Sequence, residues 1–262
     1  LIIYSSIIIF IFGFLDDIFN LRVLSRLISQ FLSVSILIGS GFIVNNFGFY
    51  QFTNNSYLFV PIIFTAISIV GLTNSINFID GLDGLCSSVF ITSILSLLFV
   101  LILNDSSFED VQILILLLII VSAFFLMNLN IFLIGKVFLG DSGSINLGFL
   151  LSCLLIYFSQ FQEINIDPQL VIWCVTLPIF DFFAVTIKRL LNKKNPFSPD
   201  RTHVHHILLS KSFSQHKVLF ILIFVSIFFN FMGFAIYYLF GSFVAFTFFL
   251  ILFFVYYFLK YK

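Results

Sequence analysis

The stretch VQILILLLIIVSAFFLM, residues 111–127, holds no charged side chain and shows no alternation of polar and apolar residues. Continuous apolarity over about 20 residues is typical of a helix that crosses a bilayer, and it argues against the alternating strands of an outer-membrane barrel. The sequence therefore predicts an all-α fold, a polytopic transmembrane bundle of nine helices in a single domain over residues 1–262. The other eight spans are residues 1–15, 27–44, 57–73, 84–103, 143–159, 169–187, 218–240 and 242–259.

The composition points to the same environment. Of the 262 residues, 61% are hydrophobic and 9% are charged, whereas a soluble domain carries about 25% charged residues. A soluble core could not bury this much apolar surface, so we expect most of the surface to face a lipid bilayer and no nucleic acid to be a partner. Pro61 and Pro178 lie inside predicted spans and are expected to kink them.

The distribution of charge predicts the orientation of the bundle. If the first span ends on the inner side, the opposite side receives no basic residue and holds Asp105, Glu109, Asp110, Glu163 and Asp167. Because short cytoplasmic loops carry the excess of Lys and Arg, the inner side is predicted to be cytoplasmic. All twelve basic residues fall there: Arg22, Arg26, Lys136, Lys188, Arg189, Lys193, Lys194, Arg201, Lys211, Lys217, Lys260 and Lys262.

Most of the acids on the cytoplasmic side belong to four short segments, and two of these could hold a cation. In GFLDDIFN, residues 13–20, the adjacent carboxylates of Asp16 and Asp17 repel each other unless a cation lies between them; a solvated helix end is the alternative. In FLGDSGS, residues 138–144, Asp141 has small hydroxyl and glycine neighbours that suit Mg²⁺. The alternative there is a capped helix start.

The second segment in chain order is NSINFIDGLDGL, residues 74–85. Asn77, Asp80 and Asp83 are spaced three apart, so on a helical turn their polar groups share one face. The two glycines permit close approach of a ligand to the backbone. This pattern indicates a binding segment, with an ordinary polar loop as the alternative.

The fourth segment is the long inner loop, residues 188–206, which contains PFSPDRTHVHH. Its histidines, His203, His205 and His206, could form a zinc site, but Zn²⁺ prefers a closed tetrahedral shell and no cysteine lies nearby. Arg201 and the flanking lysines fit phosphate binding better. Carboxylates for Mg²⁺ together with cations for phosphate predict a membrane enzyme of Mg²⁺-dependent phosphoryl transfer.

The four segments, in this order and at these helix ends, resemble the polyprenyl-phosphate N-acetylhexosamine 1-phosphate transferase family. The resemblance covers residues 10–210 closely and the last two helices by topology. Members of that family have about eleven helices, so we expect two N-terminal helices and the loop between them to be missing from this chain.

The resemblance implies a reaction and its setting. An N-acetylhexosamine 1-phosphate, here N-acetylglucosamine 1-phosphate, passes from a UDP-N-acetylsugar to undecaprenyl phosphate, and UMP is released. The expected location is the bacterial cytoplasmic (inner) membrane, with the active site facing the cytoplasm, and the product begins a cell-surface polysaccharide. Mg²⁺ is the expected cofactor, Mn²⁺ is a substitute for it, and a homodimer is an allowed assembly.

The resemblance also implies roles for individual residues. Asp141 corresponds to the aspartate that coordinates Mg²⁺, and Asp16 and Asp17 correspond to a pair that deprotonates the lipid phosphate or helps to hold the metal. With these three, His203 and His205 complete the expected catalytic set. The expected substrate-binding residues are Asn77, Asp80 and Asp83 for the nucleotide, Phe138 for the uracil ring, and Arg201 and His206, with the other two histidines, for the diphosphate and sugar.

The histidine segment separates two branches of the family. This chain reads His-Val-His-His at 203–206 and continues with Ile207 and Leu208, whereas the phospho-MurNAc-pentapeptide transferases of peptidoglycan synthesis carry three consecutive histidines followed by Phe-Glu. We therefore expect the N-acetylglucosamine branch, with the pentapeptide branch as the alternative. An alternative of another class is a secondary transporter for an anionic metabolite, with Asp181, the acid deepest within a span, as a coupling site.

Cysteine accessibility tests the orientation. In a cysteine-free variant, the thiol of Asn54→Cys should react with an impermeant reagent outside intact cells. The thiol of Lys193→Cys should react only after the membrane is opened, because the two positions lie on opposite sides. Labelling of both positions from the same side would contradict the predicted orientation.

Overall fold

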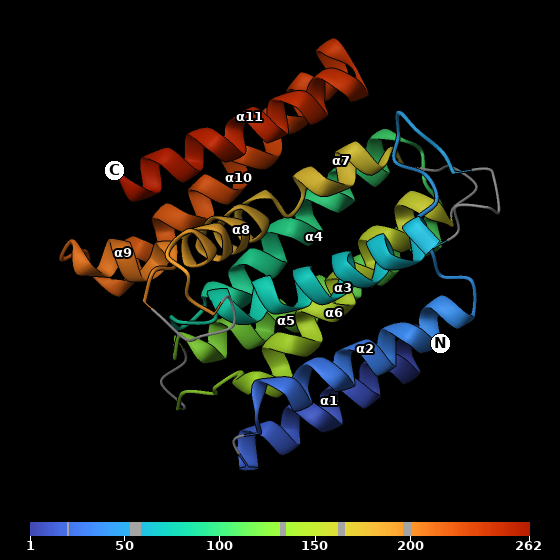
Figure 1. Ribbon diagram of the computed structural model, residues 1–262. Helices are drawn as coiled ribbons and strands as arrows, with labels where there is room; N and C mark the ends of the chain where they lie inside the picture. The colour runs from blue at the N-terminus through green and yellow to red at the C-terminus, as the bar shows by residue number, and fades with distance from the viewer. Residues whose placement is uncertain (20, 53–58, 132–134, 162–165, 196–200) are drawn as a thin grey trace.

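The computed structural model describes residues 1–262 except 20, 53–58, 132–134, 162–165 and 196–200 (Figure 1), so Asn54, Glu163 and part of the histidine segment lie outside the described residues. Regular structure in the described part is helical, apart from one isolated antiparallel bridge between Asn46 and Gln51. The helices are α1 (Ile2–Phe19), α2 (Val23–Gly39), α3 (Phe59–Ile79), α4 (Leu85–Leu103), α5 (Phe108–Asn128), α6 (Gly140–Gln160), α7 (Pro168–Trp173), α8 (Thr176–Leu191), α9 (Val204–Ser210), α10 (Gln215–Phe240) and α11 (Ser242–Tyr261).

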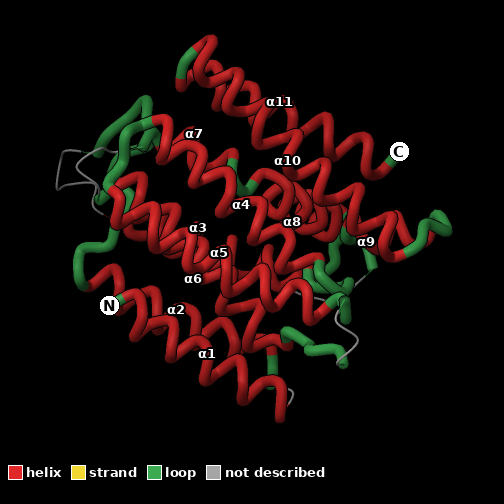
Figure 2. Tube along the Cα trace, turned by 180° about the vertical axis from the view of Figure 1, so that it is seen from behind, coloured by secondary structure: helices red, strands yellow, loops and turns green. Residues whose placement is uncertain are grey.

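The long helices run side by side, with α1 and α2 at one edge of the bundle and α10 and α11 at the opposite edge (Figures 1 and 2). Between these edges, α6 packs against α1 and α3, and α4 packs against α5 and α10. The buried apolar side chains form two clusters. One surrounds Ile69 and Phe149 between α1, α2, α3 and α6, and the other surrounds Phe90, Trp173 and Phe180 between α4, α7, α8, α10 and α11.

The predicted helical membrane bundle is confirmed, with two of the predicted spans differing in form. Seven of the described helices are long and apolar enough to cross a bilayer, namely α1, α3, α4, α5, α6, α10 and α11. The predicted span 27–44 is α2, which is apolar but has 17 residues. The predicted span 169–187 is divided into α7 and α8, and the short helix α9 in the histidine loop had no counterpart among the predicted elements.

Pro178 explains the break between α7 and α8. It is the third residue of α8, where a backbone N–H has no acceptor within the helix, and its ring would clash with the carbonyl of Cys174 in a continuous helix. The hydroxyl of Thr176 donates to the carbonyl of Trp173 at 2.8 Å and so satisfies one acceptor freed at the break. Pro61 lies in the first turn of α3, which continues past it to Ile79.

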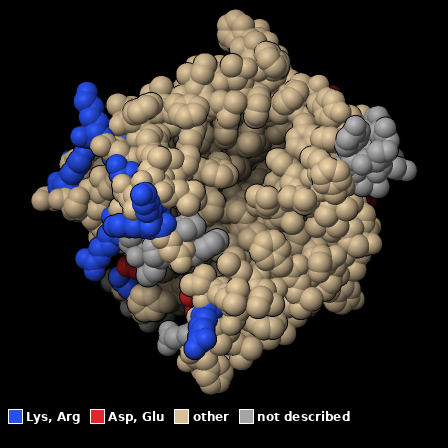
Figure 3. Space-filling model, viewed as in Figure 1, with Lys and Arg blue, Asp and Glu red and all other residues tan. Residues whose placement is uncertain are grey.

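The charged residues lie at the ends of the bundle. Figure 3 shows Lys and Arg side chains gathered at one end, called the basic end below, where α1, α3, α5, α8 and α11 finish and α2, α4, α6 and α10 begin. The flanks between the ends expose apolar side chains, such as Leu116 on α5 and Phe254 and Phe258 on α11. A continuous apolar surface of this kind is suited to lipid.

Small residues allow α6 and α3 to cross at close range. A Cβ atom on Gly148 would lie 2.7 Å from the carbonyl oxygen and 2.9 Å from the Cα atom of Thr73. The hydroxyls of Thr73 and Ser152 donate to carbonyls one turn earlier in their own helices, at 2.6 and 2.7 Å, so neither polar group is left unpaired in the apolar layer. The crossing brings the start of α6 beside the end of α3 at the basic end.

The variant Gly148→Ala tests this crossing. The added methyl group meets the backbone of Thr73, which cannot yield as a flexible side chain would, so the free energy of unfolding in detergent should fall by about 1–3 kcal/mol. Gly71→Ala on α3 is the matched control because nothing lies within 4 Å of its Cβ position. Thermal unfolding should separate the two variants; equal melting temperatures would show that the crossing tolerates a larger residue.

Candidate active site

Asp17 caps the start of α6. Its Oδ1 accepts the backbone N–H of Asp141 at 2.7 Å and its Oδ2 accepts that of Ser142 at 3.1 Å. Gly140 makes this possible, because it adopts a φ of +67° and a Cβ atom there would lie 2.7 Å from Oδ2 of Asp17. The carboxylate also complements the positive end of the helix dipole. Asp17 therefore fixes the position of α6 at the basic end.

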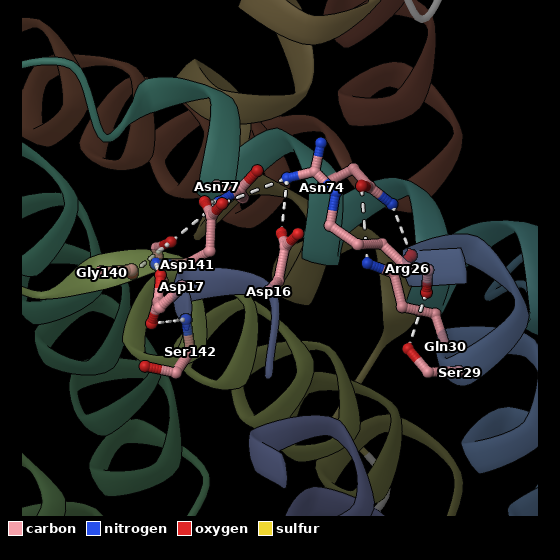
Figure 4. A network of polar contacts seen from close by, with 11 residues as sticks. Asp16, Asp17, Arg26, Ser29, Gln30, Asn74, Asn77, Gly140, Asp141 and Ser142 are labelled. Atoms are coloured by element: carbon pink, nitrogen blue, oxygen red, sulfur yellow. Dashed lines mark hydrogen bonds and ion pairs between the residues drawn. The ribbon is translucent and has the colours of Figure 1, made fainter. Parts of the chain in front are cut away.

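Arg26 joins the other two predicted carboxylates (Figure 4). One guanidinium nitrogen, Nη1, lies 3.3 Å from Oδ2 of Asp16 and 3.2 Å from Oδ2 of Asp141. The side chain of Asp16 is 4% exposed, so it needs a partner of opposite charge. The sequence left open a cation between Asp16 and Asp17 or a solvated helix end, whereas the structure places Arg26 of α2 between Asp16 and Asp141.

Asn77 links this cluster to α3. Its amide donates to Oδ1 of Asp141 and to the hydroxyl of Ser144, both at 2.8 Å. One turn earlier, the amide of Asn74 donates to Oε1 of Gln30 at 2.7 Å, which ties α3 to α2. Four helices, α1, α2, α3 and α6, therefore position the carboxylates of the cluster, as Figure 4 shows.

The two later acids of the second segment differ in their surroundings. Asp80 is partly buried, and desolvation, with the charges of Asp141 and Asp83, raises its pKa to about 7. Asp83 instead pairs with Lys136 at 2.5 Å and lines a polar cavity of about 310 Å³. That cavity is also lined by Asn130, Lys136, Gln215 and His216. The side chain of Phe138, in the loop before α6, is exposed.

The histidine segment packs against the second segment. His203 precedes α9, is buried, and contacts Phe78 with ring centroids 5.6 Å apart. His205 lies so close to Gly81 that a Cβ atom there would overlap its ring. Burial, with the neighbouring charge of His206, lowers the pKa of His205 to about 4, so its ring is neutral at pH 7.

The remaining residues of this segment lie nearer the surface. The rings of His205 and His206 are 4.1 Å apart between centroids. Arg201 is exposed and directly follows residues 196–200, which are outside the described part. The structure thus places the histidine segment against Gly81, beside Asp80, and leaves Arg201 exposed at the surface.

Asp16 and Asp141 fit a hard cation. The position of Arg26 shows that a positive group is accommodated between them, and carboxylate oxygens are ligands that Mg²⁺ prefers. In the described part of the chain, no group of three or more His, Cys, Asp or Glu side chains is arranged to hold a metal ion. Mg²⁺ often uses one or two carboxylates together with substrate phosphates. Asp17 fits less well, since both its oxygens already accept N–H groups.

Sequence reasoning missed several members of the site. Arg26 and Lys260 were used only to orient the bundle, although each is a cation in an otherwise apolar helix and therefore needs an anionic partner. Asp181 accepts hydrogen bonds from His203 and Lys260 at 2.7 and 2.6 Å. Its position within a span was the signal that such partners exist. Their identity required the fold.

A bundle that crosses the membrane many times and gathers carboxylates, an arginine and histidines at one end is a polytopic membrane protein with a polar site at the membrane surface. Residues 1–159 match the profile described as Glycosyl transferase family 4. The chain belongs to this family.

Three relatives illustrate the similarity. The undecaprenyl-phosphate alpha-N-acetylglucosaminyl 1-phosphate transferase of Thermotoga maritima is 31% identical over 233 residues, covering 87% of this chain and 67% of the relative. The probable undecaprenyl-phosphate N-acetylglucosaminyl 1-phosphate transferase of Bacillus subtilis is 31% identical over 233 residues, covering 86% and 62%. The Escherichia coli K12 protein with the same name as the first is 26% identical over 225 residues, covering 81% and 58%. The chain thus spans 58–67% of the length of these curated relatives.

The raised pKa of Asp80 predicts a pH signature. Between its ordinary value of 3.8 and about 7, the folded protein keeps a proton on Asp80 that the unfolded chain has released, so the stability from this group is lost as the pH rises through 7. The melting temperature should therefore fall more between about pH 5.5 and pH 8 in the wild type than in Asp80→Asn, which cannot titrate there. Asp105→Asn, an exposed acid at the opposite end, should behave as the wild type. Parallel curves for the wild type and Asp80→Asn would contradict the raised pKa.

Proposed function

We propose that this protein transfers N-acetylglucosamine 1-phosphate from UDP-N-acetylglucosamine to undecaprenyl phosphate on the cytoplasmic face of the bacterial cytoplasmic membrane, with release of UMP. The observation that carries the proposal is the cluster of Asp16, Arg26, Asn77 and Asp141 at the basic end. Such a cluster can bind both a cation and a diphosphate. The names of the relatives support the acceptor and the sugar phosphate.

In this reaction the protein has to neutralise the negative charge of the phosphates, and it need not form a covalent bond to the substrate. An oxygen of the lipid phosphate attacks the β-phosphorus of the sugar nucleotide, a new phosphorus–oxygen bond forms, and the bond from that phosphorus to the bridging oxygen breaks as UMP leaves. Any proton on the attacking phosphate passes to a carboxylate, for which Asp16 and Asp80 lie at the site. Arg26, His205 and His206 offer N–H groups to the phosphate oxygens. Mg²⁺, or Mn²⁺ in its place, would bind Asp141 and Asp16 and neutralise the diphosphate.

An apolar groove supports a polyprenyl acceptor. It has a volume of about 510 Å³ and is formed by α3, α6, α7, α8 and α11, and Figure 3 shows the face of the bundle hollowed where these helices meet. The groove begins at Phe47 and Phe64 at the end away from the basic residues and reaches Ser75 and Ile187 at the basic end. The groove therefore ends two residues before Asn77 on α3, next to the cluster that would receive the phosphate of a polyprenyl chain.

The polar cavity beside Asp83 supports a nucleotide donor. Carboxylate, amide and imidazole groups line it, and these can recognise the edge of a nucleobase. Asp83 connects the cavity to the segment that carries Asn77 and Asp80. The transporter alternative needs Asp181 as a site for a coupling ion. The carboxylate of Asp181 instead pairs with His203 and Lys260, so this alternative is not favoured.

The substitution Asp141→Asn tests the proposed metal site. A neutral amide is a weaker ligand for Mg²⁺, so the complete protein should lose Mg²⁺-dependent turnover, and Mg²⁺ should no longer raise its melting temperature. Glu109→Gln, an exposed acid at the opposite end, is the control and should retain both effects. Turnover of Asp141→Asn within about tenfold of the wild type would argue against Asp141 as a ligand.

The function itself is tested by UMP release. The complete protein in detergent with undecaprenyl phosphate and Mg²⁺ should release UMP from UDP-N-acetylglucosamine and form a lipid-linked diphosphate sugar. UMP release only with UDP-MurNAc-pentapeptide would support the peptidoglycan branch. Absence of UMP release with either donor would contradict the proposed function.

A further inference from the structure

Asp181 is a buried carboxylate at which three helices meet. Its Oδ2 lies 2.7 Å from Nδ1 of His203, before α9, and its Oδ1 accepts the Nζ–H of Lys260 at 2.6 Å and the hydroxyl of Tyr256 at 3.1 Å, both from α11. The backbone N–H of Val204 also donates to Oδ1, at 3.0 Å. The side chains of Asp181 and Lys260 are 2% and 3% exposed.

Each partner has a separate effect on Asp181. Lys260 supplies a full positive charge, so that the ion pair is neutral as a unit and its burial is tolerated. Tyr256 and Lys260 are four residues apart and therefore share one face of α11, and both bind the same oxygen. Since Oδ1 already accepts three donors, Oδ2 is the oxygen left for His203.

The orientation of the carboxylate determines what His203 offers. A hydrogen bond from Nδ1–H to Asp181 places the proton on Nδ1 and leaves Nε2 for a ligand. The ring is also held by contact with Phe78, and it lies 6.0 Å from the ring of His205, which packs on Gly81. An unbroken series of contacts therefore runs from α11 through Asp181 to the candidate active site.

We propose that Lys260 and Tyr256 are positioning residues for His203: they fix the Asp181 carboxylate, which holds the His203 proton on Nδ1, so that Nε2 accepts a hydrogen bond from a sugar hydroxyl or a protonated phosphate of the substrate. The expected effect on turnover rests on the proposed function. The expected position of the proton on the imidazole of His203 does not. A histidine that receives or shares a proton commonly has its other ring nitrogen held by a hydrogen bond, which fixes the orientation and the tautomer of the ring.

Lys260→Met is the main test, since it keeps the length of the side chain and removes its charge. The carboxylate of Asp181 would then draw its counter-charge from His203, which should become protonated on both nitrogens. Nitrogen NMR of ¹⁵N-histidine-labelled protein, with His203→Ala to assign the signal, should show Nδ1–H in the wild type and both N–H groups in Lys260→Met. In the transfer assay kcat should fall about tenfold or more, with KM for the sugar nucleotide changed less than about threefold.

Two further variants keep the test decisive. Lys262→Met removes an exposed lysine two residues later and should leave both the NMR signal and kcat unchanged. Tyr256→Phe preserves volume and the ion pair, so it folds even where Lys260→Met does not, and it should lower kcat about threefold or more by freeing the carboxylate. Wild-type NMR signal and kcat in both Lys260→Met and Tyr256→Phe would overturn the proposal. If the wild type releases no UMP, the proposed function fails, and the NMR comparison alone then decides whether Lys260 controls His203.

Discussion

A carboxylate at the edge of a hydrocarbon layer must meet a cation or several N–H donors, because an unpaired charge there costs a few kcal/mol. In this bundle the partners come from other helices. Asp16 of α1 and Asp141 of α6 share Arg26 of α2, and Asp181 of α8 pairs with Lys260 of α11. The contacts that neutralise the acids therefore also hold the helix ends together, and the site forms where those ends meet.

α6 connects this charge balance to the packing of the bundle. It is the least apolar of the seven long spans, and its four serines are buried in the bundle. Asp141 opens the helix beside Arg26, and five residues further the hydroxyl of Ser6 on α1 donates to the amide oxygen of Asn146 at 2.6 Å. Gly148 then allows α3 to approach closely. A more apolar α6 would be a better isolated span, but it could not bring α1 and α3 to one site.

The fold could be predicted because runs of neighbouring residues determine the spans. The site could be predicted only in part, because its charged side chains pair with residues far away in the sequence. Long apolar runs identify spans, and Pro178 indicated where one of them is interrupted, because these effects depend on neighbouring residues. Asp16 and Asp17 looked equivalent, yet one is buried against Arg26 and the other caps α6. Their difference depends on a helix more than 100 residues away. For the same reason, the residues around Lys260 in the sequence do not indicate that its partner is Asp181.

The cap formed by Asp17 has a consequence for inhibitor design. The start of a helix ordinarily attracts anions, and a phosphate mimic would be drawn to the exposed amides. At α6, the N–H groups of Asp141 and Ser142 are already taken by a carboxylate of the protein, so an acidic compound aimed there would have to expel it. Neutral compounds that place a hydrogen-bond acceptor at Arg26 and a donor at Nε2 of His203 would avoid this competition and would cross membranes more readily than charged mimics.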